Sequence, residues 1–177
     1  MRPILIDNVN CFRDHRGIFY ESFKTSTFKE LYGIEEVFVQ DNHSVSCKNT
    51  IRGMHYQWNK PMGKLVRVAA GAITDIVIDI RKGSDSFGNI YRYELNEENL
   101  QQLYVPPGYA HGFICRSDTA IVMYKCTAEY NKNGESGINP FDPSLSIDWG
   151  IPQSSAVVSE KDKSAKSMDQ YLKEPRF

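Results

Sequence analysis

The chain lacks the long apolar runs, the charge excess and the cysteine pairs that mark several common classes of protein. Nothing in its 177 residues approaches the ~20 consecutive apolar residues of a membrane span, and the start, Met1 to Asp7, is too short and polar for a signal peptide. The formal net charge is -1, so no broad positive field attracts nucleic acid or an anionic membrane. An anionic ligand therefore requires a local binding site.

Motifs of cofactor chemistry are also missing. The four cysteines form no Cys-x-x-Cys pair, which together with the missing signal peptide favours a reducing, cytoplasmic location. No nucleophile elbow, phosphate-binding loop or dinucleotide fingerprint occurs. Only His55 and His111 lie in the runs that invite a metal site, which is fewer than the three protein ligands of most catalytic metals unless acidic residues complete the set. We therefore expect no metal.

Alternation of apolar and polar residues recurs through the middle of the chain, whereas helical periodicity is scarce. The clearest strand is Ile73 to Ile80. Ile76 and Ile78 share one face while Asp75 and Asp79 share the other, which predicts burial mainly on one side. Further strands are predicted at residues 18–23, 36–40, 50–57, 64–70, 90–95, 101–105, 112–115 and 120–127.

Many short strands separated by turns predict a mainly β fold, either a closed barrel or a jelly roll, within a single domain over residues 1–177. A few short helices are expected, one at residues 25–32 capped by Thr25 or Ser26 and another within residues 162–172. The last twenty or so residues are charged and carry little apolar signal, which is typical of a loosely packed tail.

The run from Thr50 to Gln57 places His55 among apolar, aromatic and cationic residues. Imidazole is the side chain that exchanges protons near neutral pH, so a histidine held in a pocket can act as a base. Arg52 has the opposite strand parity, but a bulge at Gly53 would bring both side chains to one site. Arg52 would then suit a phosphate or carboxylate. A satisfied structural histidine and a surface ion pair are the alternatives.

Two further side chains share strand faces with apolar residues. Lys64 shares a face with Val66, so it either lies in the barrel interior, where its charge needs an anion nearby, or extends from the strand start into solvent. Tyr124 shares a face with Val122, and its hydroxyl is a candidate acid or hydrogen-bond donor. Buried structural tyrosines are the alternative, because the phenol has a reference pKa of about 10.

Several motifs follow one another in a fixed order along almost the whole chain. They are residues 14–23, residues 39–44, the Arg-Gly-x-His-x-Gln run at 52–57, and residues 63–66, 77–81, 107–113, 124–127 and 159–162. With these motifs the chain resembles the dTDP-4-dehydrorhamnose 3,5-epimerase family, a branch of the cupin barrels. The resemblance implies a cupin-type jelly-roll β-barrel and an epimerase that needs no cofactor.

The resemblance also implies roles for individual residues. His55 is the implied base, Asp162 pairs with it, Tyr124 is the acid on the opposite face of the sugar, and Lys64 is the cation beside the enolate oxygen. The C-terminal segment, residues 157–177, thus supplies Asp162. The positions that match substrate binding around the nucleotide, diphosphate and sugar are Gln40, Asn42, Arg52, Gln57, His111, Tyr130, Glu135 and Lys161.

Three more residues match positions that reach into the site of a neighbouring subunit in this family. They are Arg16, Phe19 and Glu21, and the match implies a homodimer with shared active sites. No nucleic-acid or membrane partner is expected.

The implied substrate is a nucleoside-diphosphate-linked 4-keto sugar, with dTDP-4-dehydro-6-deoxyglucose as the prototype, inverted at C3 and C5 or at C3 alone. One departure bears on its identity. Met62 stands where the family usually has glutamine, and the preceding loop, residues 58–61, is short. The same chemistry on a GDP-linked 4-keto heptose for capsule or surface polysaccharide synthesis is therefore an alternative. A 3,4-ketoisomerase and a non-catalytic sugar-binding cupin are further alternatives.

Overall fold

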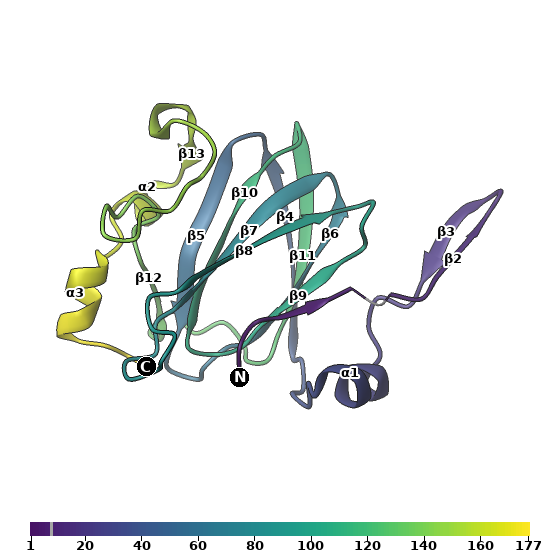
Figure 1. The fold of residues 1–177 in the computed structure, drawn as a ribbon, viewed down its shortest axis with the longest axis horizontal. Coiled ribbons are helices and arrows are strands. Elements are labelled where there is room, and N and C mark those ends of the chain that lie inside the picture. The colour runs from purple at the N-terminus through teal and green to yellow at the C-terminus, as the bar shows by residue number, and fades with distance from the viewer. Residues whose placement is uncertain (8) are drawn as a thin grey trace.

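Two β-sheets face each other and form most of the molecule (Figure 1). The protein is seen here as a computed structural model that describes residues 1–7 and 9–177. The strand order of the five-stranded sheet is β1 (Ile4–Ile6), β9 (Gln102–Val105), β6 (Lys64–Ala70), β11 (Thr119–Cys126) and β4 (Gln40–Cys47). The six-stranded sheet has the order β12 (Glu135–Gly137), β5 (Thr50–Gln57), β10 (Tyr109–Cys115), β7 (Ala72–Asp79) and β8 (Ile90–Asn96), and β13 (Val157–Val158) pairs in parallel with β5.

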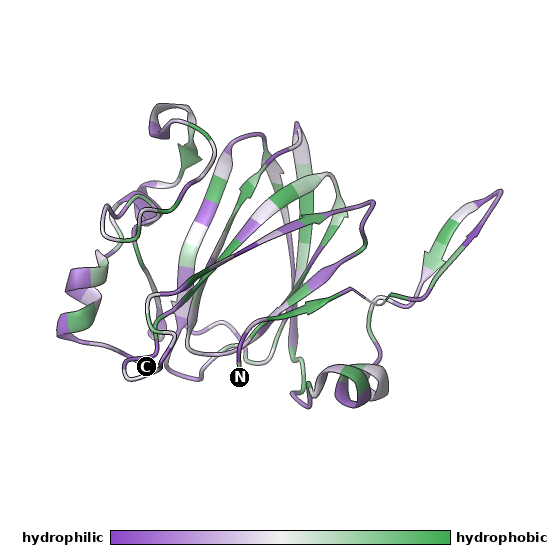
Figure 2. Cartoon of the chain, viewed as in Figure 1, coloured by the Kyte–Doolittle hydropathy of each residue, from purple (hydrophilic) through white to green (hydrophobic). Residues whose placement is uncertain are grey.

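From β4 to β12 the chain passes repeatedly from one sheet to the other, as in a jelly roll. Apolar side chains from both sheets, among them Val66, Val77, Leu103 and Val122, form one buried cluster. Figure 2 shows how apolar residues concentrate on the barrel strands. The predicted mainly β, cupin-type jelly-roll barrel is confirmed.

Strand β7 departs from its predicted pattern because both of its faces are buried. Ile76 and Ile78 pack outside the barrel in a cluster with Trp149 and Tyr171. The opposite face carries Asp75, which is 0% exposed although the sequence predicted burial mainly on one side. That prediction was wrong because the C-terminal part of the chain covers the outer face, while the polar face points into the barrel.

The C-terminal segment, residues 157–177, packs firmly rather than forming a loose tail. It contains two short helices, α2 (Glu160–Lys163) and α3 (Met168–Lys173), where the sequence predicted one. Ser167 caps α3 in a reciprocal pair with Gln170, and the buried Tyr171 donates a hydrogen bond to the carbonyl of Ile80 at 2.6 Å. The buried Met168 and Tyr171, together with the capping box, thus hold the segment on the outer face of the six-stranded sheet.

The remaining differences from the sequence prediction are local. Helix α1 (Thr25–Tyr32) has the predicted bounds, but its N-cap is Lys24, which makes no side-chain cap bond. Residues 36–39 lie outside the strands, and β4 begins at Gln40. Gln153–Ser155 form one 3-10 turn, and no helix in residues 1–7 and 9–177 is long and apolar enough to cross a membrane.

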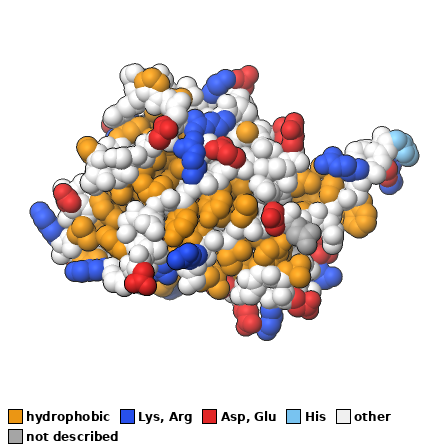
Figure 3. Space-filling view, viewed as in Figure 1, with side chains coloured by type: hydrophobic (Ala, Val, Ile, Leu, Met, Phe, Trp, Pro, Cys, Tyr) orange, Lys and Arg blue, Asp and Glu red, His pale blue; other side chains and the backbone are white. Residues whose placement is uncertain are grey.

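A two-stranded hairpin of β2 (Cys11–Asp14) and β3 (Gly17–Tyr20) projects away from the barrel (Figure 1). Phe12 and Phe19 are 67% and 72% exposed, with ring centroids 6.5 Å apart. In the space-filling view the hairpin protrudes from the body with apolar and charged side chains on its surface (Figure 3). Exposed aromatic rings on a projecting element are typical of a contact with another chain.

Candidate active site

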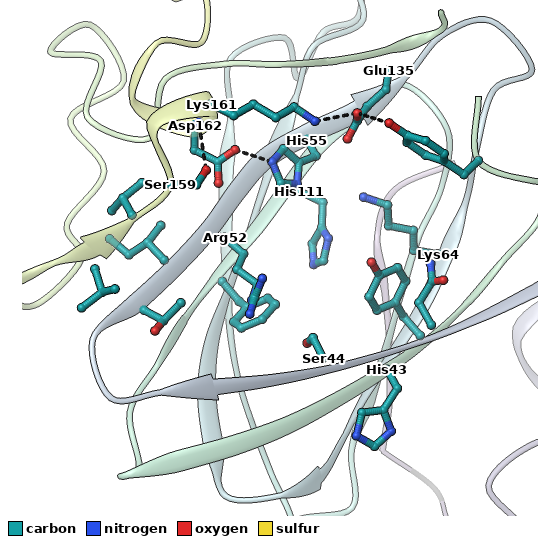
Figure 4. Close-up of a pocket in the computed structure, with 18 of the residues that line it drawn as sticks. His43, Ser44, Arg52, His55, Lys64, His111, Glu135, Ser159, Lys161 and Asp162 are labelled. Atoms are coloured by element: carbon teal, nitrogen blue, oxygen red, sulfur yellow. Dashed lines mark hydrogen bonds and ion pairs between the residues drawn. The ribbon is translucent and has the colours of Figure 1, made fainter. Parts of the chain in front are cut away.

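A cavity of about 840 Å³ opens between the two sheets, and the C-terminal segment forms part of its wall (Figure 4). Histidines, lysines, an arginine and carboxylates from elements far apart in the sequence converge on it. A concave site with several convergent ionisable groups is the usual location of a binding or catalytic function.

His55 on β5 pairs with Asp162 on α2, with Nε2 and Oδ1 2.7 Å apart. The backbone N–H of Gly53 donates to the other carboxylate oxygen at 3.3 Å. The N–H of Asp162 donates to Ser159 Oγ, the cap of α2. Burial raises the pKa of Asp162, but the hydrogen bonds from His55 and Gly53 outweigh it and lower that pKa below its ordinary value. An ionised carboxylate therefore holds the ring of His55 and leaves Nδ1 as the free ring nitrogen.

The backbone of β5 is irregular beside this pair. His55 lies opposite His111 on β10 and Arg52 lies opposite Phe113, so three steps on β5 face two steps on β10. A Cβ at Gly53 would lie 2.5 Å from the Cα of Gly112, a contact that only glycine permits. The predicted irregularity at Gly53 is present, and both His55 and Arg52 line the cavity.

The opposite wall, from the five-stranded sheet, carries Lys64 and Tyr124. Burial lowers the pKa of Lys64 and raises that of Tyr124, because a charge on either group is poorly solvated there. Cys126, the cross-strand partner of Lys64, has its pKa raised to about 11 by burial. Of the two positions expected for Lys64, the structure has the interior one. A lysine in such surroundings binds most strongly to a group that develops negative charge.

His111 belongs to a second His–Asp pair in the same cavity. Its Nε2 lies 2.9 Å from Oδ2 of Asp75, and the two side chains are 7% and 0% exposed. Burial lowers the pKa of His111, although the nearby Asp75 opposes the shift. Sequence reasoning placed Asp75 on a strand face but gave it no role in the site. One sequence signal could have indicated this role, namely an acidic residue within a strand that is otherwise strongly apolar.

Three side chains form a connected group at the cavity rim. Lys161 Nζ donates to Glu135 Oε2 at 2.6 Å, and the hydroxyl of Tyr130 donates to the same oxygen at 3.0 Å. Burial raises the pKa of Glu135, but the hydrogen bonds from Lys161 and Tyr130 lower it overall. Next to them, Gln40 and Asn42 share a hydrogen bond of 2.9 Å and also line the cavity. All five matched positions therefore lie at one site.

Gln57 has a different position from the other matched residues. Its amide nitrogen donates to the carbonyls of Lys60 and Glu129, and its amide oxygen accepts from the N–H of Asn131. The side chain thus ties two loops together. With Met62 it borders a recess of about 80 Å³ that also contacts Lys64 and Tyr124.

Arg16, Phe19 and Glu21 do not line the cavity of their own chain. Arg16 pairs with Asp14 in the exposed hairpin, and Phe19 and Glu21 are exposed. Ser159 lines the cavity and orients Asp162, a role that the sequence reasoning missed although a serine three residues before an acid is a helix-cap signal. No cluster of three or more His, Cys, Asp or Glu side chains suited to a metal ion occurs within residues 1–7 and 9–177.

Several known proteins are similar to this chain in sequence and structure. The family model described as dTDP-4-dehydrorhamnose 3,5-epimerase matches residues 2–170. A curated protein of that name from Salmonella typhimurium is 43% identical over 170 residues, covering 96% of this chain and 92% of its own length. The crystal structure of the Legionella pneumophila 3,5-epimerase with dTDP-4-keto-L-rhamnose has a TM-score of 0.90 and 42% identity, and covers 94% and 88% of the two chains. A 3'-monoepimerase from Streptomyces bikiniensis with dTDP-quinovose has a TM-score of 0.89 and 28% identity, and covers 97% and 86%.

Proposed function

The chain belongs to the dTDP-4-dehydrorhamnose 3,5-epimerase family, and from that premise we propose that it inverts C3 and C5 of dTDP-4-dehydro-6-deoxyglucose. It is an isomerase that acts on a nucleotide-linked 4-keto sugar. Residues 1–177 are proposed to form one such domain. The relatives favour this function over a ketoisomerase, a non-catalytic cupin or an enzyme for GDP-linked heptoses.

The chemistry explains why a base, an acid and a cation suffice. In a 4-keto sugar the hydrogens on C3 and C5 are both adjacent to the carbonyl, so a base can remove either one if the resulting enolate is stabilised. Return of a proton to the opposite face of the carbon inverts its configuration. A site with proton-transfer groups on two facing walls is therefore required.

His55 and Tyr124 meet this requirement because they lie on facing sheets of the barrel, and this observation carries the proposal. In the proposed mechanism Nδ1 of His55 removes the proton, while Asp162 holds the ring through Nε2 and stabilises the imidazolium. Lys64 stabilises the enolate oxygen, and Tyr124, which burial keeps protonated, returns a proton to the other face. The cavity walls shield the enolate from bulk water.

The test is solvent exchange. The protein is incubated with dTDP-4-dehydro-6-deoxyglucose in deuterated water, and deuterium at C3 and C5 is followed by NMR. We expect label at both carbons. Label at C3 alone would mean a monofunctional enzyme like the Streptomyces bikiniensis relative, and label at neither carbon would contradict the proposal.

His55→Ala is the first control, and it should abolish exchange at both carbons. Exchange retained by this variant would assign the base to another residue. The GDP-linked 4-keto heptose is tested in parallel with the wild-type protein, because Met62, which follows the short loop at 58–61, borders the recess beside Lys64. Faster exchange with the GDP-linked sugar than with the dTDP-linked sugar would make the GDP-linked sugar the preferred substrate and contradict the proposal.

We also propose that the active sites are shared within a homodimer. The exposed hairpin carries Arg16 and Phe19 away from the cavity of its own chain, which supports a role in the cavity of a neighbour. Mixing Arg16→Ala with His55→Ala tests this, since only a mixed dimer combines an intact base with an intact hairpin. If subunits exchange at random, about half of the dimers are mixed, and one of the two sites in each mixed dimer is intact. The two weak variants should therefore together recover about a quarter of wild-type activity. Simple addition of the two residual activities would exclude shared sites.

A cytoplasmic location and a role in deoxysugar or surface polysaccharide synthesis are proposed as well. All four cysteines are free in the structure, which supports a reducing compartment. Fractionation of the source cells followed by detection with an antibody would test the location.

A further inference from the structure

The hydrogen bond between His111 and Asp75 has a defined donor and acceptor. Oδ2 of Asp75 lies 2.9 Å from Nε2 of His111, and a carboxylate can only accept a hydrogen bond, so Nε2 carries the hydrogen of this bond. Nε2 of His111 is therefore the donor and Asp75 the acceptor. The remaining ring nitrogen, Nδ1, has no hydrogen bond to any residue in the described part of the chain.

The surroundings of His111 also keep its ring neutral. Burial is the main cause of its lowered pKa, and the nearby Lys64 and His55 lower it further, against the opposing effect of Asp75. These groups come from β6, β5 and β7, the elements around the ring. A neutral ring with its hydrogen on Nε2 carries a lone pair on Nδ1, and Nδ1 can then only accept a hydrogen bond.

Asp75 makes its one side-chain hydrogen bond within the described residues to His111, and its charge also acts on Lys64. Its side chain is completely buried, and its second oxygen, Oδ1, has no hydrogen-bond partner among the described residues. A buried carboxylate with a single hydrogen bond costs free energy unless nearby groups compensate its charge, and His111 and Lys64 are the groups near Asp75. The nearby buried Asp79 differs, because it is bonded to Arg81, Ser84 and Ser86 in a structural network outside the cavity.

We propose that Asp75 is a positioning residue that holds His111 in the tautomer whose Nδ1 accepts a hydrogen bond from a hydroxyl of the sugar. The acceptor would distinguish a sugar that carries a ring hydroxyl at C2 or C3 from one that lacks it. This inference rests on the proposed function for its ligand, but the state of the ring can be measured without any substrate.

The first test is nitrogen-15 NMR of the wild-type protein labelled at histidine, at pH 7 and without ligand. His111 should show a protonated Nε2 and an unprotonated Nδ1. A proton on Nδ1, alone or together with Nε2, would overturn the proposal whether or not the protein is an epimerase. His111→Gln assigns the signals.

The second test compares kcat/KM of the wild-type protein for the dTDP 4-keto sugar with the values for its 2-deoxy and 3-deoxy analogues. One analogue should be disfavoured about tenfold or more, because a site built to bond a hydroxyl rejects a ligand that lacks it. Asp75→Asn should lower kcat/KM for the full sugar about tenfold to a hundredfold and shrink the preference, because the amide allows the other tautomer. Equal values for all three sugars would overturn the inference.

Asp79→Asn is the matched control, since it removes a buried carboxylate from the same strand without touching His111. It should lower thermal stability while leaving the tautomer and the sugar preference as in the wild type. If Asp75→Asn does not fold, the tautomer and the analogue ratios of the wild type still decide the matter. Failure of exchange with every nucleotide sugar, with the expected tautomer present, would sink the proposed function and leave the positioning role of Asp75 standing.

Discussion

The cavity contains two His–Asp pairs that are alike in chemistry and different in construction. In the first, His55 is 30% exposed and its partner Asp162 comes from a four-residue helix 107 positions further along the chain. In the second, His111 is 7% exposed and its partner Asp75 comes from the adjacent central strand. Solvent can therefore stabilise a positive charge on the ring of the first pair, whereas the second pair is shielded from solvent.

This difference shows how burial selects between two uses of one side-chain combination. A base must become an imidazolium during the reaction, which an open, carboxylate-bound ring tolerates. An enclosed ring whose pKa is lowered by burial is better suited to accept a hydrogen bond than to carry a proton. In the proposed mechanism, the same two residue types thus serve proton transfer at one position and recognition at the other.

The largest effect is expected from replacing the two histidines separately by asparagine. His55→Asn should lower kcat for deuterium exchange by about 10²- to 10⁴-fold, because the proton acceptor is lost. His111→Asn should lower kcat/KM only about tenfold to a hundredfold, because a binding contact is lost. An equal loss in kcat for both variants would show that the two pairs have the same task.

The second-largest effect is expected from Asp162→Asn. The amide cannot stabilise the imidazolium and can hold the ring in the wrong tautomer, so kcat should fall about 10²- to 10³-fold with little change in KM. Single-turnover exchange measures the chemical step directly. A change confined to KM would instead place Asp162 in substrate binding.

A smaller effect is expected from the cap that supports only the first pair. Ser159→Ala removes the acceptor for the N–H of Asp162, and kcat should fall about two- to tenfold, in line with the usual cost of losing a cap. Ser159→Thr keeps a capping hydroxyl and should retain most of the activity. If alanine and threonine behave alike, the cap does not position Asp162.

The smallest effect is expected in the pH dependence of the free energy of unfolding. The two His–Asp pairs should contribute to it in different pH ranges. The pKa of His111 is lowered in the folded protein, so the unfolded chain binds this proton more readily and the free energy of unfolding falls as pH drops below about 6.5. The pKa of Asp162 is also lowered, so its stabilisation is complete above the ordinary aspartate value of about 4 and is lost as pH falls below it.

Urea unfolding at a series of pH values measures both effects. The variant His111→Gln should lose less stability than the wild type between pH 7 and 5, and Asp162→Asn should lose less between pH 5 and 3. Curves parallel to the wild type in these windows would contradict the assigned shifts.

Much of the barrel could be predicted from the sequence because period-two alternation reports directly which strand faces are buried. The strands at 64–70 and 90–95 and the helix at 25–32 were found in this way. The alternation failed at β7, where Asp75 and Asp79 were assigned to the less buried face. In a barrel the polar face of a strand can point inward to a ligand cavity, and local pattern does not distinguish this from solvent.

The site was predictable in part for the same reason. Strand parity placed Lys64 and Tyr124 on faces that line the cavity, and Gly53 indicated the irregularity that lets both Arg52 and His55 line it. The pairing of His55 with Asp162 joins residues 107 positions apart, and only the resemblance to a known family indicated it. Asp75 and Ser159 were missed because their partners are distant or local contacts that strand parity does not report: Asp75 pairs with His111, and Ser159 accepts from the backbone N–H of Asp162.

The contact between Gly53 and Gly112 has a consequence for how this enzyme can be altered. A Cβ at Gly112 would lie 2.7 Å from the carbonyl oxygen of Arg52, and a Cβ at Gly53 would meet Gly112 as closely. Any larger residue at either position forces β5 and β10 apart and displaces His55 and His111 together. In a mutational library both positions should therefore admit almost no variation, so changes aimed at the substrate range are better placed elsewhere, for example at Met62 beside the recess.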